Sequence, residues 1–373
     1  MSKSLLEILQ SIEDPRHAKN RRYSLDEILF LCVCAVVSGA EGWSAIAQFG
    51  EAKLAWLRRF LAYENGIPNE DTIAWVIGRL RVKEFEKHFV QWMRGITPEP
   101  DGEIISIDGK TARRSHDRRK NKSPLHMVSA WAGKQGVSLG QVATAEKSNE
   151  ITAIPVLLDL LELKGALITI DAMGCQTAIT QRIIAKKADY VLALKGNQGL
   201  THDAVIDYFE AAEKVNFAHV PVTIKTTLDE GHGRIETRMY YLARDINTLP
   251  KAEVWSGLSS IGMVLSHRKD KATGKQTSER RYYLSSVTEV ELFAEAVRAH
   301  WGVENQLHWV LDMVFREDES RIRSGDTPAI FNIFRQFANN VLRKMDSTLS
   351  IKARRFQAAM DDDFRAKVLL CGT

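Results

Sequence analysis

Two aspartates each stand at the end of an apolar run of residues. Asp108 ends the run in IISIDGK, and Asp171 ends the run in LITIDAMG. An ionised carboxylate in such surroundings is unfavourable without a partner, and two close carboxylates repel unless they share a proton or bind a cation. Either aspartate alone is more readily explained as a turn or helix-cap residue. The pair, at the ends of neighbouring strands, instead favours a site for a hard divalent ion such as Mg²⁺.

A third carboxylate is expected from the segment HWGVENQLHWVLD. Its titratable residues recur every four positions, which predicts one slowly drifting face of a helix; they are His300, Glu304, His308 and Asp312. Because tryptophans flank this stripe, a site explains it better than a solvated face. A zinc site is the weaker alternative, since no second cluster of histidine or cysteine accompanies the histidines. We therefore expect His300 and His308 to orient Glu304 or to contact phosphate.

The segments between these carboxylates predict the fold that positions them. Short β-rich runs cover 103–107, 125–132 and 137–144, which suggests an antiparallel meander. They are followed by a helix over 151–163, a strand over 166–170, a helix over 176–187 and a strand over 190–194. The order βββαβαβ predicts an α/β fold with a mixed sheet (α+β mixed sheet) of the ribonuclease-H-like kind. In that sheet the first strand lies beside the fourth, so the two aspartates would meet.

The remaining sequence predicts what surrounds this catalytic domain. At 373 residues the chain exceeds the size at which single cores tend to divide. Helical spacing over 1–96 predicts an all-α N-terminal domain that could bind DNA, with a proline-containing linker at 97–102. The catalytic domain is predicted to cover 103–345, with a β-rich insertion at about 218–287, and 346–373 is predicted to be a basic tail.

Composition limits the classes of protein that the chain can belong to. Hydrophobic residues make up 45% and charged residues 26%, as in ordinary globular proteins. The net charge of +4 permits a nucleic-acid partner without requiring one. Four scattered cysteines favour reduced thiols over disulfides or structural zinc. The longest apolar run, 28–40, is too short to cross a membrane, and together with the reduced thiols this predicts a soluble, cytoplasmic protein that is not exported.

Cations cluster next to the predicted carboxylates. Those that follow Asp108 could hold a DNA backbone, although most such runs are solvated hairpins; they include Lys110, Arg113, Arg114, Arg118 and Arg119. Lys195 and Asn197 follow the fifth predicted strand, at an edge where α/β sheets tend to bind ligands. We expect both groups to face the substrate.

Several motifs together identify a family. The segments IDGK, DAMGCQ, LKGNQ, GHGR, HWGVEN and LHWVLD occur in this order, with SGAEGW at 38–43 and NGIP at 65–68. Over nearly its whole length the chain resembles the H-repeat-associated insertion-sequence transposases found with Rhs elements, a branch of the D-D-E transposase superfamily. The resemblance implies a catalytic and metal-binding triad of Asp108, Asp171 and Glu304 that holds two Mg²⁺ or Mn²⁺ ions. It also implies double-stranded DNA partners, namely the terminal repeats of the element and the target, cut and joined by a homodimer in the synaptic complex.

The chain departs from better-known relatives around the third carboxylate. Their Tyr, Arg, Glu, Lys signature would fall on Val297, His300, Glu304 and Leu311, and only the glutamate matches. We expect Arg298, His300, His308 or Lys195 to supply the missing phosphate contacts. Three alternatives stay open: a metal-dependent DNA nuclease of the same fold, a catalytically silent DNA-binding relic, and a ribonuclease acting on RNA hybrids.

Overall fold

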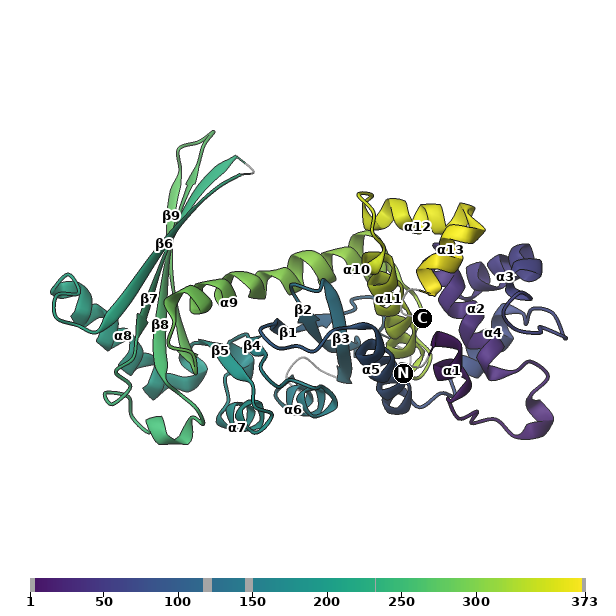
Figure 1. Cartoon of the computed structure of the whole chain (residues 1–373), viewed down its shortest axis with the longest axis horizontal. Coiled ribbons are helices and arrows are strands. Elements are labelled where there is room, and N and C mark those ends of the chain that lie inside the picture. The colour runs from purple at the N-terminus through teal and green to yellow at the C-terminus, as the bar shows by residue number, and fades with distance from the viewer. Residues whose placement is uncertain (1–3, 117–122, 145–149, 232, 371–373) are drawn as a thin grey trace. The chain divides into compact units, whose positions relative to one another are not determined.

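The computed structural model describes residues 4–116, 123–144, 150–231 and 233–370 (Figure 1). Contacts divide the chain into two compact units. The first unit comprises 1–99, 109–161 and 304–373, and the second comprises 100–108 and 162–303. Residues 97–102, the predicted linker, follow a helix that ends at Ile96 and precede a strand that begins at Ile104. However, the helices before this linker form one unit with later segments, because the chain returns to them after residue 303.

Within the described residues the strands form one mixed sheet of nine, in the order β3-β2-β1-β4-β5-β9-β8-β7-β6. Its first five strands are β1 (Ile104–Thr111), β2 (His126–Ala132), β3 (Val137–Thr144), β4 (Leu167–Ile170) and β5 (Asp189–Leu194). β4 pairs in parallel with both β1 and β5, whereas β2 and β3 are antiparallel. The order 3-2-1-4-5 and the crossover helices confirm the predicted ribonuclease-H-like sheet, with the first strand beside the fourth.

The two crossover helices follow from the sequence pattern. α6 (Glu150–Leu160) leads to β4, and α7 (Thr177–Ala185) leads to β5. In the second unit α7 packs beside β5 (Figure 1). The strands of this part are buried along almost their whole length, as expected for parallel strands covered by helices.

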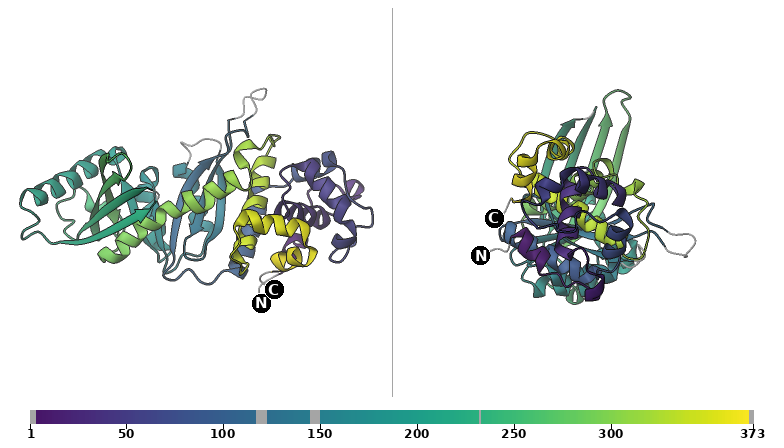
Figure 2. Two further views of the ribbon diagram at one scale, coloured as in Figure 1. Left: turned by 90° about the horizontal axis from the view of Figure 1, so that it is seen from above. Right: turned by 90° about the vertical axis from the view of Figure 1, so that its right-hand side faces the viewer.

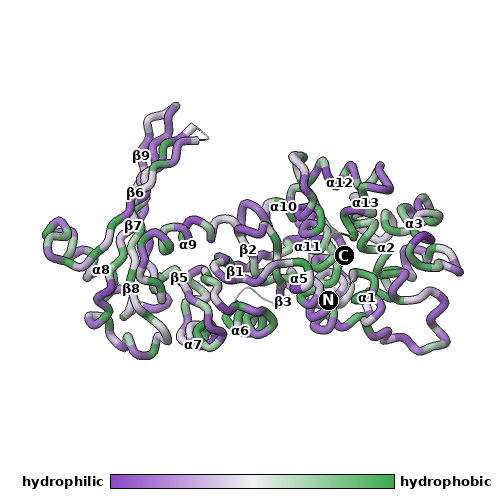
Figure 3. The backbone as a smooth tube through the Cα atoms, in the orientation of Figure 1, coloured by the Kyte–Doolittle hydropathy of each residue, from purple (hydrophilic) through white to green (hydrophobic). Residues whose placement is uncertain are grey.

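The β-rich insertion holds four strands between residues 222 and 285, and a helix precedes it. After α8 (Gly199–Lys214), which was not predicted, the chain forms β6 (Val222–Gly231), β7 (Arg234–Ala243), β8 (Ser260–Asp270) and β9 (Gln276–Ser285). β8 was missed because only its first half is buried. The outer ends of these strands are hydrophilic (Figure 3). Ion pairs cross between them, including Arg268 of β8 with Glu236 of β7 and Arg238 of β7 with Asp229 of β6.

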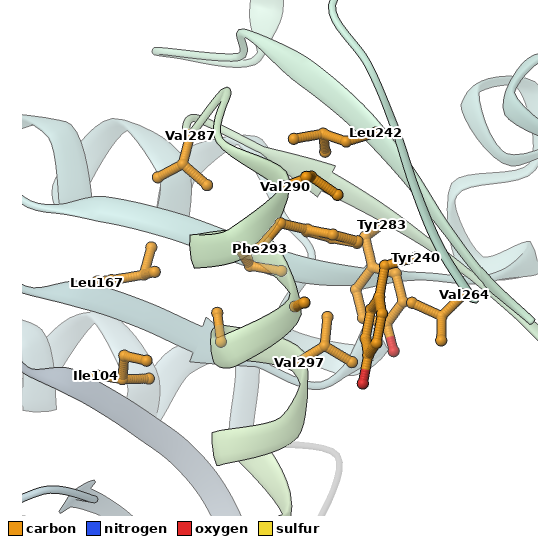
Figure 4. Packing of buried hydrophobic residues seen from close by; sticks show 13 residues of the cluster. Ile104, Leu167, Tyr240, Leu242, Val264, Tyr283, Val287, Val290, Phe293 and Val297 are labelled. Carbon is orange, nitrogen blue, oxygen red and sulfur yellow. The ribbon is translucent and has the colours of Figure 1, made fainter. Parts of the chain in front are cut away.

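Helix α9 (Val290–Gly302) buries one face against strands of the second unit. Phe293 lies at the centre of this core with Tyr240 and Tyr283, whose rings meet it nearly edge-on (Figure 4). At Gly262 a Cβ atom would lie 2.4 Å from the Phe293 ring, so only glycine permits this approach of β8 to the helix. The core fixes α9 on the sheet and thereby fixes the residues of its last turn.

The first unit contains two buried helices, α2 (Leu25–Val37) and α11 (Thr327–Lys344), which pack on each other. The helices around them are α1 (Leu5–Gln10), α3 (Trp43–Leu57), α4 (Glu70–Ile77), α5 (Val82–Ile96) and α10 (Trp309–Met313). The predicted basic tail also belongs to this unit and is helical, with α12 (Ile351–Met360) and α13 (Asp362–Leu369) beside the N-terminal helices (Figure 2). Arg355 makes this contact by donating to the carbonyls of Val36 and Ala40.

Of the helices described, none is both long and apolar enough to span a membrane.

Candidate active site

Asp108 and Asp171 follow paired positions on adjacent parallel strands. Ile107 of β1 is in register with Ile170 of β4, and each aspartate is the next residue. Two residues earlier, the hydroxyl of Thr169 donates to that of Ser106 at 3.0 Å, so these side chains share one face of the sheet. Because side chains alternate along strands, Asp108 and Asp171 lie on that same face. The arrangement is the one the sequence predicted for this pair.

Local hydrogen bonds hold the Asp171 carboxylate in place. Its Oδ1 accepts from the backbone N–H groups of Met173 at 3.0 Å and Gly174 at 3.3 Å, capping a short 3-10 turn over Ala172–Gly174. The cap interpretation is therefore correct for this oxygen. It does not exclude a ligand role, because a carboxylate has two oxygens and several lone pairs.

His300, in the last turn of α9, reaches the same face. Its Nδ1 lies 3.0 Å from the Thr169 hydroxyl oxygen. The Ser106 hydroxyl donates to the carbonyl of Ala299, a group that can only accept, so Ser106 accepts from Thr169. Thr169 has no second proton, and Nδ1–H of His300 must donate to it. The chain of hydroxyls thus assigns the tautomer and leaves Nε2 as an acceptor.

The charge state of His300 agrees with this assignment. Burial lowers the pKa of His300 to about 4, although the nearby Asp171 carboxylate opposes the shift. At neutral pH the ring is uncharged. A phosphate contact by His300 would therefore lack the positive charge that arginine supplies at this position in the related signature.

The segment from His300 to Asp312, predicted as one polar face of an α-helix, contains a change of helical winding. A π-helical turn covers Val303–His308, between α9 and α10. Within this segment Glu304 is exposed whereas His308 is only 8% exposed. π-Helical turns occur frequently at functional sites. The hydrophobic spacing does not indicate this turn, since the buried Val303 and Leu307 keep the four-residue step of an ordinary α-helix.

The three residues after Asp108 are fixed by polar partners that the sequence did not indicate. His126 Nδ1 lies 2.8 Å from the Thr111 hydroxyl, and His126 Nε2 lies 2.6 Å from Glu150 Oε1. A Cβ at Gly109 would lie 2.4 Å from both of those His126 and Glu150 atoms, so this position requires glycine. Each partner is distant in sequence and lies in an ordinary strand or helix, so no motif identifies it.

Lys110 lies between those residues and is largely buried. Its ammonium pairs with Asp312 at 2.7 Å, with Asp318 at 3.6 Å and with Glu317. Burial alone would lower the pKa of Lys110, but the carboxylates of Glu317 and Asp312 outweigh it and raise the pKa. The lysine therefore remains charged, and its charge is directed at these carboxylates.

The other predicted DNA-binding residues occupy different surroundings. Exposed side chains include Arg113, Arg114, Lys195 and Arg298. Arg298 lies 3.4 Å from Asp229 of β6, and the amide of Asn197 donates to the carbonyl of Ala172 at 2.7 Å. This last bond joins the loop after β5 to the loop after Asp171. Arg118 and Arg119 lie outside the described residues.

The side chains at this site can be compared with the ligands that the expected metal ion prefers. Two carboxylates on one sheet face, one of them ordered by backbone N–H groups, are the hard oxygen ligands that Mg²⁺ takes. Across the described ranges no three histidine, cysteine or acidic side chains are gathered closely enough to hold a metal ion. Asp108 and Asp171 belong to the second unit, whereas Glu304 begins the last segment of the first. The carboxylates of Asp108 and Asp171 therefore fit a divalent cation.

Comparison with known proteins agrees with these features. Residues 99–340 match a family model described as "Transposase DDE domain", and residues 6–93 match one described as "DDE_Tnp_1-associated". The chain is 44% identical over 371 residues to "Putative transposase YncI" of Escherichia coli O157:H7, covering 98% of this chain and 94% of that protein. It is 40% identical over 373 residues to "H repeat-associated putative transposase YhhI" of Escherichia coli K12, covering 98% of each.

One solved structure is also similar in part. It is a piggyBac transposase synaptic complex with hairpin DNA, at 13% identity and a TM-score of 0.41, covering 97% of this chain and 76% of that one. A score this low does not establish a shared fold.

Proposed function

Since this chain belongs to the family of H-repeat-associated transposases with a DDE domain, we propose that it cuts and joins DNA at the ends of an insertion sequence. The reaction is metal-dependent hydrolysis of a phosphodiester bond, followed by strand transfer. The observation that carries the proposal is the pair Asp108 and Asp171 on one face at adjacent strand ends, beneath the last turn of α9.

The proposed ligands of the metal are Asp108, Asp171 and Glu304. Two Mg²⁺ or Mn²⁺ ions, when bound, stabilise the attacking and leaving oxygens of an in-line displacement. Support for Glu304 comes from the family resemblance, from the exposure of its side chain and from its place in a π-helical turn, four residues after His300. No covalent enzyme intermediate is needed, since water and then the freed 3′-hydroxyl serve as nucleophiles.

The residues of the chain also position the DNA in this proposal. Exposed cations at Arg113, Arg114, Lys195 and Arg298 contact the phosphate backbone. His300, uncharged and fixed through Nδ1, presents Nε2 as an acceptor and helps to orient a hydroxyl or amine donor in the site. Asn197 holds the loop after Asp171 in place. The assembly that cuts both element ends is a homodimer in the cytoplasm.

The experiment is a cleavage and joining assay on a labelled duplex that carries the element end. The full chain is incubated with Mg²⁺ or Mn²⁺ and compared with Glu304→Ala and Glu304→Gln. Glu291→Ala is the matched control, because Glu291 is exposed on the same helical segment and has no assigned role. We expect metal-dependent cleavage and joining by wild type and by the control, and neither reaction by the Glu304 variants.

Other results distinguish the alternatives. Cleavage without a joined product would make the chain a nuclease of the same fold. Specific DNA binding without either reaction in the wild type would make it a silent relic. Full activity of both Glu304 variants would remove this residue from the triad.

A further inference from the structure

The contacts of Lys110 are dense for a lysine that follows an apolar strand. The side chain is 12% exposed, and Glu317, one of its three acidic partners, is 2% exposed. Its ammonium donates to Glu317 and lies within ion-pair distance of Asp312, at 2.7 Å, and of Asp318, at 3.6 Å. A phosphate oxygen would therefore have to approach the ammonium among three carboxylates of like charge.

The acidic partners are held in turn from other directions. The Asn332 amide of α11 donates to Glu317. Arg113 binds Asp318 through its backbone N–H and its Nε, each at 3.2 Å. Arg323 Nε donates to the carbonyl of Arg114 at 3.0 Å. The segment after Asp108 is therefore joined to the segment 312–323 at several points, with Lys110 at the most buried one.

The charge balance makes these contacts mutually dependent. Three carboxylates surround one ammonium, and Arg113 neutralises Asp318 only from the exposed side. Removal of the lysine would leave the buried Glu317 carboxylate with the Asn332 amide as a hydrogen-bond donor in place of an ammonium. Loss of one partner of a buried ion pair is strongly destabilising, because the other charge stays in the protein.

Lys110 and its acidic partner Asp312 lie in elements close in sequence to the proposed metal ligands, so their ion pair bears on the site as well as on stability. Lys110 comes two residues after Asp108 in the single strand β1. Asp312 comes eight residues after Glu304, in the helix that continues from the π-helical turn. The ion pairs of Lys110 thus join the strand that carries one proposed metal ligand to the helix that follows another.

We propose that Lys110 is a positioning residue, which fixes the end of β1 against the 312–318 segment and thereby sets the carboxylates of Asp108 and Glu304 for metal binding. This inference rests on the proposed function. It replaces the DNA contact that the sequence suggested for Lys110, since a phosphate would have to displace carboxylates of like charge.

The test measures cleavage, DNA affinity and metal affinity separately. Lys110→Met, Lys110→Arg and Asp312→Asn are compared with wild type, and Lys214→Met is the control, an exposed lysine in the last turn of α8. DNA affinity is measured by fluorescence anisotropy in EDTA over a range of salt. Binding of Mn²⁺ is followed by the electron paramagnetic resonance signal of the free ion.

For Lys110→Met we expect the DNA affinity and its salt dependence to stay unchanged and Mn²⁺ binding to become weaker. The cleavage rate at saturating DNA should fall about 100-fold, because misplacement of catalytic groups by about 1 Å can produce such a loss. Lys110→Arg retains the charge and should recover part of the rate. If Lys110→Met does not fold, Asp312→Asn tests the inference instead, because it leaves the Lys110–Glu317 pair in place. This variant should still cleave more slowly at unchanged DNA affinity.

Two outcomes overturn the inference alone. One is that the Lys110 and Asp312 variants cleave DNA at the wild-type rate and bind Mn²⁺ with the wild-type affinity. The other is weaker DNA binding with a salt slope smaller by about 0.9, the signature of a lost phosphate contact. Absence of cleavage by the wild-type protein would instead overturn the proposed function, and this inference with it.

Discussion

The Nδ1 atom of His300 lies 3.0 Å from the hydroxyl of Thr169, two residues before Asp171 on the same strand. This contact ties the last turn of α9 to the strand that carries the aspartate. It also fixes the tautomer of the ring, because the hydroxyl proton of Thr169 is already donated to Ser106.

Substitution of Thr169 by valine removes the acceptor for His300 and keeps the shape of the side chain. We expect a loss of stability of about 1–3 kcal/mol, since the buried Nδ1–H is left without its partner. Urea denaturation measures this loss. Thr223→Val, at an exposed position of β6, is the control and should change stability little. Equal stability of both variants would contradict the assigned hydrogen-bond chain.

Protonation of His300 should occur only in acid. Burial lowers its pKa to about 4, below the unfolded value of 6.5. Between these values the unfolded chain binds more protons, so this group makes the folded state less stable as pH falls from about 6.5 to 4. Nitrogen-15 NMR of the histidines should show an Nδ1–H neutral ring at pH 6. A ring that is protonated at pH 6 would contradict both the shift and the tautomer.

Glu86 of α5 gives the opposite dependence on pH. Burial raises its pKa to about 8, above the ordinary value of 4.5, despite a hydrogen bond from the backbone of Ala143. The folded state then holds a proton that the unfolded chain releases, so this group lowers stability as pH rises from about 4.5 to 8. Glu86→Gln should remove this decline in thermal unfolding experiments. Glu84→Gln, an exposed control on the same helix, should retain it.

Gly109→Ala should disturb the protein more than an ordinary glycine substitution. The added Cβ would lie 2.4 Å from His126 Nε2 and Glu150 Oε1, so a buried pair must move. Overpacking of this kind costs about 1–3 kcal/mol, measurable by denaturation. Gly196→Ala is the matched control, since no atom lies within 4 Å of its Cβ position. If the two variants were equally stable, His126 and Glu150 would not constrain this strand end.

The C-terminal helices should be required for the stability of the first unit. Arg355 of α12 donates to the carbonyls of Val36 at 3.1 Å, Ala40 at 3.2 Å and Val314 at 2.6 Å. Arg355→Met removes the guanidinium from all three carbonyls, although that of Val36 keeps its bond from the backbone N–H of Gly39. We expect a loss of several kcal/mol. Arg59→Met, at an exposed arginine, serves as control in the same unfolding experiment. A variant as stable as wild type would contradict the role of Arg355 as an anchor of α12.

Much of the fold follows from the sequence because its signals are local. The apolar runs before Asp108 and Asp171 predicted two strands, and the βββαβαβ order predicted their adjacency, which the register of Ile107 with Ile170 confirms. β8 escaped prediction because its burial changes halfway along the strand, and α8 because a polar helix carries weak periodicity. The basic composition of 346–373 suggested a tail, although buried arginines anchor its helices.

The sequence by itself determined the family, the order of the strands and the two aspartates, because motifs and apolar periodicity are properties of neighbouring residues. Only the tertiary structure decided that Glu304 lies in a π-helical turn, that His300 is neutral against Thr169, and that Lys110 is directed at Asp312, Glu317 and Asp318. Each of these depends on groups brought together from distant parts of the chain. Burial and opposite charge, which set their ionisation and their hydrogen bonds, arise only when the chain folds.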